Sequence, residues 1–255
     1  MYAEERQEVL AAQIARDGRV SVSQAAEQFG VTTETIRRDL AALEERGLVR
    51  RVHGGAVPAT ARTTVEVAVA ERDQAAGPQK DRIADAALAL VPHDGGSIVL
   101  DAGTTTSRLA AKLPIDAPLT VITNAVPVAA QVVALPGAEL ILLGGRVRAR
   151  TGAAVGRAAE SALGDLRADV AFLGTNGISL EHGLTTPDPD EAAVKAAMVA
   201  AGRRVVVLAD SSKLHLESLV RFAGLDQVDA LVTDAGIDAE TRRALEAAGV
   251  EVVVA

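Results

Sequence analysis

The segment from Ser97 to Thr106 combines residue types that can bind an anion. Its sequence, Ser-Ile-Val-Leu-Asp-Ala-Gly-Thr-Thr-Thr, leads from an apolar strand into a glycine and threonine loop that opens a helix. Backbone N–H groups at a helix N-terminus attract anions, three hydroxyls add donors, and Gly103 lets a ligand approach the backbone closely. The loop lacks the Gly-Lys-Ser/Thr of a Walker A loop and the Gly-x-Gly-x-x-Gly of dinucleotide sites. The spacing therefore fits a phosphate site, or else a capped turn without a ligand.

Polar residues also follow three other apolar runs. These segments are Thr123-Asn124, Gly144-Gly145 and Gly174-Thr175-Asn176-Gly177. In an open α/β sheet, ligands bind at the carboxyl ends of the strands. One crevice could therefore collect these three segments together with the loop at 101–106.

Two lysines could complete such a crevice. Lys195 lies in Asp190-Glu191-Ala192-Ala193-Val194-Lys195, and Lys213 lies in Asp210-Ser211-Ser212-Lys213. Either ammonium group could neutralise a phosphate or hold a sugar hydroxyl. The spacing is also compatible with a surface ion pair between Glu191 and Lys195 and with a simple turn that begins at Asp210.

A second group of residues, between Thr33 and Arg38, suits contact with DNA. Ile36, Leu40 and Leu43 form an apolar stripe at i, i+4 and i+7, which turns the polar side chains toward other faces. Arginine can bond guanine through two hydrogen bonds or hold phosphate, and threonine can touch a thymine methyl group. The side chains with these roles are Thr33, Glu34, Arg37 and Arg38, and a basic set that follows them, Arg50, Arg51 and His53, suits phosphate or the minor groove.

Three helices and a hairpin would position the DNA-reading residues. The pattern predicts helices at 3–17, 22–29 and 33–46, and a glycine-rich hairpin at 48–57. Gly30 permits a tight turn, Thr32 caps the third helix, and Ser21 with Gln24 has the form of a capping box. A helix, a tight turn, a second helix and a wing dock in the major groove. Residues 1–57 are therefore predicted to be a winged helix-turn-helix, although a three-helix packing or dimerisation module is an alternative.

The remainder of the chain alternates between β-branched runs and helical stretches. Strands are expected at Ser97–Leu100, Thr120–Thr123, Glu139–Leu143, Asp169–Leu173, Arg204–Leu208, Ala230–Thr233 and Glu251–Val254. Helices are expected at 79–91, 105–113, 125–134, 156–165, 190–201 and 238–248. This alternation predicts an α/β domain with a mainly parallel sheet over 79–255. Residues 58–78 indicate a linker, with a short helix near Val65–Arg72.

Composition excludes several classes of protein. The 255 residues contain no cysteine, so disulfides and thiolate metal sites are absent. Aromatic residues make up 2%, which disfavours a protein that stacks bases of single-stranded nucleic acid. The net charge is −8, but residues 1–57 hold 8 arginines against 9 acidic residues, so any DNA contact must use a local basic patch. No apolar run reaches the ~20 residues of a membrane span, and a cytoplasmic location is expected.

The N-terminal motifs resemble the signature of the DeoR family of bacterial transcriptional regulators. The matching stretches are Val20-Ser21-Val22, Phe29-Gly30-Val31-Thr32, Thr35-Ile36-Arg37-Arg38-Asp39-Leu40, Leu43-Glu44 and Gly47-Leu48-Val49-Arg50-Arg51-Val52-His53-Gly54-Gly55-Ala56. The rest of the chain resembles that family's sensor domain, which looks like sugar-phosphate isomerases of the ribose-5-phosphate isomerase type. The resemblance implies a repressor of a carbohydrate-metabolism operon that a phosphorylated sugar relieves. Its implied partners are double-stranded operator DNA and further copies of the chain in a dimer or tetramer, and a fructose phosphate is the suggested sugar.

The resemblance also assigns residues to sites. DNA contacts are expected from Ser21, Thr32, Thr33, Glu34, Thr35, Arg37, Arg38, Arg50, Arg51 and His53. Asp101, Gly103, Thr104, Thr105 and Thr106 match the phosphate loop, and Asn124, Gly145, Lys195 and Lys213 match segments that border the effector pocket. No catalytic residue, metal or cofactor is implied.

Two other functions compete with a ligand-controlled regulator. One is a sugar-phosphate isomerase with a DNA-binding appendage, for which Asp101, Asp190, Glu191 and Lys195 include candidate acids and bases. The other is a constitutive DNA-binding scaffold whose second domain only forms oligomers. Product formation from pentose or hexose phosphates would indicate the enzyme, and the scaffold predicts no stabilisation by any sugar phosphate.

Overall fold

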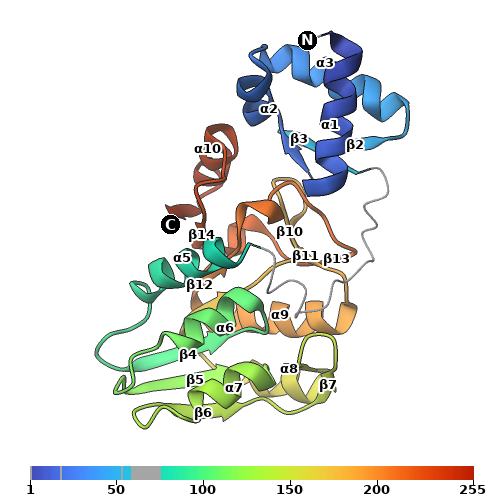
Figure 1. Ribbon diagram of the computed structural model, residues 1–255. Coiled ribbons are helices and arrows are strands. Elements are labelled where there is room, and N and C mark those ends of the chain that lie inside the picture. The colour runs from blue at the N-terminus through green and yellow to red at the C-terminus, as the bar shows by residue number, and fades with distance from the viewer. Residues whose placement is uncertain (1, 18, 53, 59–75) are drawn as a thin grey trace.

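The computed structural model describes residues 2–17, 19–52, 54–58 and 76–255 (Figure 1). His53, for which a DNA contact was predicted, and the helix predicted near 65–72 therefore lie outside the described residues. Most of the predicted linker at 58–78 lies outside them as well. Residues 2–58 form one unit with its own apolar core, and residues 76–255 form a second unit with a separate core. Figure 1 shows the N-terminal unit, in blue, at one end of the C-terminal unit.

The N-terminal unit is a winged helix-turn-helix, as predicted. Its helices are α1 (Ala3–Asp17), α2 (Val22–Phe29) and α3 (Thr33–Glu45). Strands β1 (Val20–Ser21), β2 (Val49–Val52) and β3 (Gly55–Pro58) form an antiparallel sheet in the order β1-β3-β2. Leu10 and Ile14 of α1 pack with Ile36, Leu40 and Leu43 of α3, and all five are at most 1% exposed. Burial of this stripe turns the polar side chains of α3 toward its other faces.

The turn between α2 and α3 follows from its sequence. Gly30 has a φ of 64° and donates its N–H to the carbonyls at the end of α2, a left-handed conformation that glycine adopts at little cost. Thr32 Oγ1 accepts the N–H of Thr35 at 3.2 Å and so caps α3. The predicted capping box at Ser21 is wrong. The Ser21 hydroxyl lies 2.9 Å from that of Ser23 and makes no cap bond, because Ser21 pairs with Gly55 in the β1–β3 ladder.

A parallel seven-stranded sheet forms the centre of the C-terminal unit. Its order is β15-β14-β12-β9-β4-β5-β6, and all six neighbouring pairs are parallel. The strands are β4 (Gly96–Leu100), β5 (Leu119–Thr123), β6 (Glu139–Leu142), β9 (Ala168–Leu173), β12 (Gly202–Leu208), β14 (Ala230–Thr233) and β15 (Glu251–Val254). Every predicted strand is thus confirmed to within two residues, because runs buried on both faces read as continuous apolar sequence.

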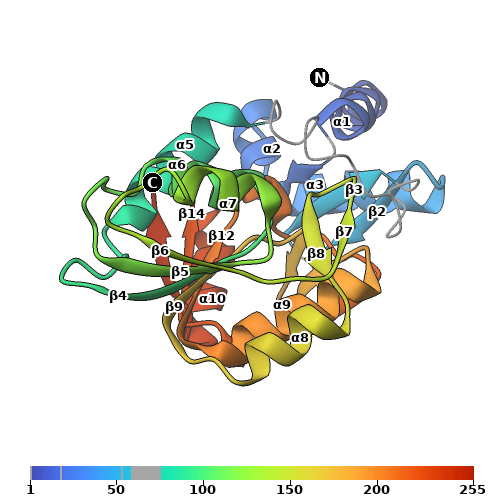
Figure 2. The same ribbon diagram turned by 90° about the horizontal axis from the view of Figure 1, so that it is seen from below.

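Helices cover both faces of this sheet. Figure 2 shows α5 (Gly77–Leu88), α6 (Thr104–Ala111) and α7 (Val126–Val132) on one face and α8 (Arg157–Gly164) and α9 (Pro189–Ala201) on the other. Helix α10 (Ala239–Ala247) joins β14 to β15. Phe172, Ile98 and Leu100 are fully buried between these layers. The sheet therefore carries the carboxyl ends of β4, β9 and β12 to one edge, where α6 and α9 begin.

Several short elements were not predicted. They are the hairpin β7 (Arg146–Arg148) and β8 (Ala153–Val155), the small sheet of β10 (Gly177–Ser179), β11 (Gly183–Thr186) and β13 (Val220–Ala223), and the 3-10 helices η1 (Ser211–Lys213) and η2 (Leu225–Gln227). Strands of three or four residues carry too little periodicity to stand out in sequence. Two of these elements, β7–β8 and η1, border the site described next.

Candidate anion pocket and nucleic-acid interface

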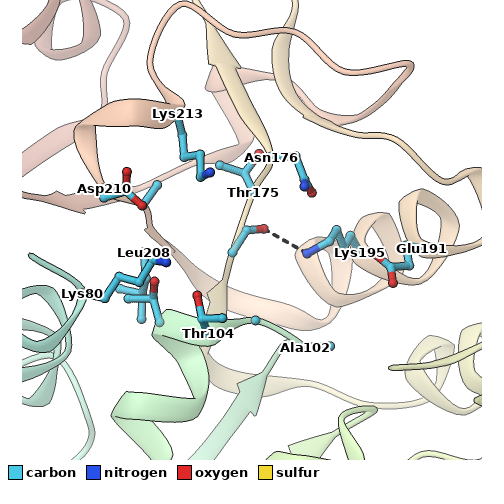
Figure 3. Close-up of a pocket in the computed structure, with 14 residues that line it drawn as sticks. Lys80, Ala102, Thr104, Thr175, Asn176, Glu191, Lys195, Leu208, Asp210 and Lys213 are labelled. Carbon is cyan, nitrogen blue, oxygen red and sulfur yellow. Dashed lines mark hydrogen bonds between the residues drawn. The ribbon is translucent and has the colours of Figure 1, made fainter. Parts of the chain in front are cut away.

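A polar pocket lies at the carboxyl ends of the central strands. It encloses about 480 Å³ of empty space, part of it open to solvent. Its lining comes from α5, α6, α9, the strand ends and η1, and Figure 3 shows these side chains gathered around one space. The lining residues are Lys80, Ala102, Gly103, Thr104, Thr105, Gly174, Thr175, Asn176, Glu191, Lys195, Leu208, Ala209, Asp210 and Lys213.

The N-terminus of α6 forms one wall of the pocket. Gly103 is the N-cap in extended conformation, and Thr104 and Thr105 are the first helical residues. The N–H groups of a first helical turn have no partner within the helix, and the helix dipole makes this end electropositive. This wall can therefore donate hydrogen bonds to an anion.

Three lysines enter the pocket from three separate elements. Figure 3 shows Lys80 of α5, Lys195 of α9 and Lys213 of η1 directed toward the same space from different sides. The lining carries these three cations against two carboxylates, Glu191 and Asp210. The pocket is therefore suited to a small ligand with negative charge.

Lys195 is held in place by a buried ion pair. Its ammonium group forms an ion pair with Asp101 Oδ2. It also donates a hydrogen bond to the Gly174 carbonyl at 2.9 Å, which Figure 3 shows as a dashed line. Asp101 is 1% exposed and Lys195 is 4% exposed. The Gly174 N–H also donates to Asp101 Oδ2 at 3.0 Å, so one carboxylate joins the ends of β4 and β9 to α9. These bonds fix Lys195 before any ligand arrives.

Glu191 is also fixed, one helical turn before Lys195 on α9. Its Oε1 accepts from Arg148 Nη1 at 2.5 Å and from Thr151 Oγ1 at 2.5 Å. Arg148 lies at the end of β7 and also contacts Asp188, the N-cap of α9, at 3.0 Å. The β7–β8 hairpin thus supports the carboxylate from behind. A carboxylate accepts hydrogen bonds only, so Glu191 is suited to receive hydroxyl donors of a ligand.

Four residues predicted to bind the effector lie outside the pocket lining. Asp101 acts through Lys195, and Thr106 Oγ1 donates to the carbonyls of Asp101 and Gly103, which stabilises the loop itself. Asn124 Nδ2 donates to the Ala154 carbonyl at 2.9 Å. Gly145 passes so close to β8 that a Cβ would lie 2.6 Å from the Val155 carbonyl oxygen. The last two residues attach the β7–β8 hairpin to the sheet, and contact of any of the four with an effector stays a prediction.

The sequence reasoning missed Lys80, which enters the pocket from α5. A signal for it was available. Lys80, Ile83, Ala84 and Ala87 are all buried and follow one another at i, i+3, i+4 and i+7. A lysine in the apolar stripe of a helix needs a polar environment at its end, because a buried ammonium group is costly without one.

Helix α3 of the N-terminal unit exposes both basic and acidic side chains. Arg38 is 81% exposed and Arg37 is 49% exposed, and Glu34 lies 3.7 Å and 3.9 Å from their respective guanidinium groups. These surface pairs are weak and are readily exchanged for contacts with DNA. Thr33 is exposed beside them, whereas Thr32 and Thr35 hydrogen-bond each other at 2.9 Å. The roles of all these residues, and of Ser21 on β1, in DNA binding stay predictions.

The wing contributes Arg51 on β2. Its side chain is half-exposed, with Nε 3.9 Å from Glu44 Oε2, and its N–H donates to Glu44 Oε1 at 2.7 Å. The Arg50 side chain and His53 lie outside what the structure describes. Arg51 is therefore the wing cation whose contribution can be tested from the structure.

We expect Arg51→Ala to weaken binding to all duplexes similarly and to flatten the salt dependence of log Kd by about one unit, because it removes one phosphate contact. Fluorescence anisotropy on a random 30-mer between low and moderate salt measures the slope. Glu45→Ala, on the exposed end of α3, is a control for mutation of this surface. An unchanged slope would remove Arg51 from the set of phosphate contacts.

In the part of the chain that the structure describes, no group of three His, Asp or Glu side chains is placed to hold a metal ion. None of the described helices is both long enough and apolar enough to cross a bilayer.

Comparison with known proteins agrees with both halves of the structure. A model described as the DeoR-like helix-turn-helix domain matches residues 6–62, and a model described as the DeoR C terminal sensor domain matches residues 76–235. The HTH-type transcriptional regulator GlpR of Haloferax volcanii is 42% identical over 93% of this chain and 91% of its own. The Glycerol-3-phosphate regulon repressor of Escherichia coli is 32% identical, over 87% of each chain. Among solved structures, ribose 5-phosphate isomerase A of Methanocaldococcus jannaschii aligns at a TM-score of 0.41, with 19% identity over 55% of each chain.

Proposed function

Because the chain belongs to the DeoR family of transcriptional regulators, we propose that it is a DNA-binding repressor of a carbohydrate-metabolism operon and that a phosphorylated sugar relieves the repression. The observation that carries this proposal is the convergence of three lysines and the N-terminus of α6 on one pocket, in a chain that also has a winged helix-turn-helix. The phosphate would lie against α6, and the sugar hydroxyls would face Glu191 and Asn176.

The partners follow from this function. Double-stranded operator DNA would contact α3 and the wing, and two or four copies of the chain would pair half-sites, as such regulators do. The proposed domains are 1–57 for DNA binding and 79–255 for sensing, joined by a linker at 58–78. The protein would act in the cytoplasm, where the chromosome of a bacterium or archaeon lies. A fructose phosphate and glycerol 3-phosphate are the first ligands to test.

We propose that the pocket binds its ligand without turnover. Isomerisation needs a carboxylate base placed against the substrate and an acid at the carbonyl. Asp101 is held by Lys195 and the Gly174 N–H, outside the lining, and Glu191 is held by Arg148 and Thr151. Both carboxylates are thus engaged in structural bonds. Incubation with ribose 5-phosphate and fructose 6-phosphate, followed by product analysis, is expected to give no conversion.

Replacing Thr104 and Thr105 together by valine should abolish stabilisation by sugar phosphates. A ligand at 100 times its Kd stabilises the folded state by about 2.7 kcal/mol, and loss of the hydroxyls would raise Kd and remove most of this effect. Thermal shift with fructose 1-phosphate, fructose 6-phosphate, glycerol 3-phosphate and inorganic phosphate measures it. Thr120→Val, on β5 away from the pocket, is the control. Full stabilisation of the double variant would place the phosphate elsewhere, and no stabilisation of the unmodified chain by any sugar phosphate would favour the scaffold.

A further inference from the structure

The segment Asp210–His215, which contains η1, contacts both the pocket and the N-terminal unit. Asp210 and Lys213 line the pocket. Ser211, Leu214 and His215 face the DNA-binding unit, where they meet residues of β1 and of the wing. Side chains of one short segment therefore line the pocket and also contact the N-terminal unit. We call it the coupling segment.

Arg19 anchors the N-terminal unit on the coupling segment. Its Nη2 donates to Ser211 Oγ at 3.1 Å. Ser211 is itself fixed by Asp234, which accepts its N–H at 2.6 Å and its hydroxyl at 3.1 Å. Burial at this contact lowers the pKa of Arg19, and the charges of Asp210, Asp234 and Asp238 oppose that shift, so the guanidinium group lies among three carboxylates. The contact is polar and specific, and a small displacement of Ser211 would break it.

His215 supports the wing beside this anchor. The His215 ring lies so close to Gly54, at the tip between β2 and β3, that a Cβ on Gly54 would be 3.3 Å from Cε1. His215 Nε2 lies 3.0 Å from Thr241 Oγ1 and 3.7 Å from Asp238 Oδ2, and the nearby imidazole is the main cause that lowers the pKa of Asp238. The wing therefore packs against a histidine that the start of α10 holds in place.

Helix α10 brings a negative charge to the DNA-reading helix. Glu240 Oε2 lies 4.0 Å from Arg37 Nη2 of α3. Glu240 also lines a cleft together with Arg37, Leu40 and Arg51, which are residues of the recognition helix and the wing. DNA that docks on Arg37 would bring phosphates close to this carboxylate, which would repel them. The docked arrangement of the two units thus opposes DNA binding.

We propose that docking of the N-terminal unit through Arg19–Ser211 and Arg37–Glu240 is an autoinhibitory contact, and that a ligand at Asp210 and Lys213 stabilises it through the coupling segment. This mechanism rests on the proposed function, since it explains how a ligand in the pocket lowers affinity for DNA. A ligand shifts the equilibrium only as far as it binds the docked state more tightly than the undocked state. The difference in ligand affinity between the two states would arise in η1, where Lys213 lines the pocket and Ser211, two residues away, bonds Arg19.

Variants in the C-terminal unit test the contact without touching the DNA-binding surface. Ser211→Ala removes the bond to Arg19 at constant charge, and Glu240→Gln removes the carboxylate beside Arg37. Ser211→Ala should tighten binding to a duplex selected by the full-length chain by about fivefold, since it removes a polar contact that competes with DNA. Glu240→Gln should tighten it by about twofold, since the pair that it removes is exposed. Glu246→Gln is the matched control, because this exposed residue of α10 bonds Arg242 and changes the net charge equally.

Distances between the units provide a second measurement. The chain has no cysteine, so Glu45→Cys on α3 and Arg243→Cys on α10, both exposed, give one pair of spin labels. Fructose 1-phosphate or glycerol 3-phosphate, whichever stabilises the chain, should narrow the distribution of label distances around that of the docked state. Selected DNA should lengthen it, and Ser211→Ala should broaden it without ligand.

The proposal would be overturned if Ser211→Ala and Glu240→Gln bound DNA with the same affinity as the control Glu246→Gln and the unmodified chain. A label distance that neither DNA nor the sugar phosphate changes would also overturn it. Either result could occur while the chain still binds DNA and still releases it with a sugar phosphate, which would leave the proposed function standing. Absence of DNA binding in the unmodified chain would instead contradict the proposed function itself.

Discussion

Lys195→Met is expected to lower the free energy of unfolding of the C-terminal unit by about 3–5 kcal/mol. The methionine matches the lysine in length but leaves the carboxylate of Asp101 without its cation, at a site where that residue is 1% exposed. An uncompensated charge at such depth is among the costliest single changes in a protein. Urea denaturation followed by circular dichroism, at fixed protein concentration, measures the loss.

Two further variants make this result specific. Lys112→Met removes an ion pair with Asp85 whose partners are 30% and 60% exposed, and we expect it to cost less than about 1 kcal/mol. Adding Asp101→Asn to Lys195→Met should recover part of the stability, since the charge is gone and the amide oxygen can still accept the Gly174 N–H. Similar costs for Lys195→Met and Lys112→Met would show that the pair is not effectively buried.

Arg37→Ala is expected to cost about 1–3 kcal/mol in binding to the selected duplex and to relax the preference at one base pair. Arg37 is half-exposed on α3, at the side of the buried stripe that includes Ile36 and Leu40. Its position at the start of the recognition helix suits a bidentate contact with guanine. Competitive anisotropy with single-base variants of the selected duplex measures both effects.

The contribution of the neighbouring carboxylate of Glu240 to the affinity for DNA must be separated from that of Arg37. Arg37 also lies beside Glu240, so Arg37→Ala is best compared in a Glu240→Gln background, where the autoinhibitory contact is already weakened. Arg46→Ala, at the C-cap of α3, removes the same charge from the far end of the helix. Equal weakening on the selected duplex and on random DNA would mean that Arg37 holds phosphate and reads no base.

Much of the fold could be predicted because its signals are local. The stripe Ile36, Leu40 and Leu43, the glycine after α2 and the capping threonine before α3 are set by helical periodicity and turn chemistry. The seven parallel strands are apolar runs that stand out in composition. The strand–loop–helix at 97–106 predicted a phosphate site from the same kind of signal, and the structure places Gly103, Thr104 and Thr105 in the pocket lining.

Other features had no local signal. The capping box at Ser21 failed because β1 pairs with β3, a contact between residues more than 30 positions apart. Asn124 and Gly145 are strand-end residues, as expected, yet they support the β7–β8 hairpin, whose pairing is not visible in three-residue strands. The stripe of α5 carries a local signal that Lys80 is buried, but its place in the pocket was missed because that helix meets the loop at 101–106 only after the helices pack.

The sequence by itself determined the helices of both units, the seven strands of the central sheet and the order of the two units, and it predicted a phosphate site at the loop at 101–106, since each of these signals depends on neighbours within about one helical turn or strand. Only the tertiary structure decided which charges meet. Lys195 finds Asp101 across 94 positions, and Arg19 finds Ser211 across 192. Such pairs depend on how sheets and helices pack, and packing is governed by shape and burial over the whole core rather than by any local spacing. The loop at 101–106, Lys195 and Lys213 could be predicted from the sequence, whereas Lys80 and the contact with the DNA-binding unit could not.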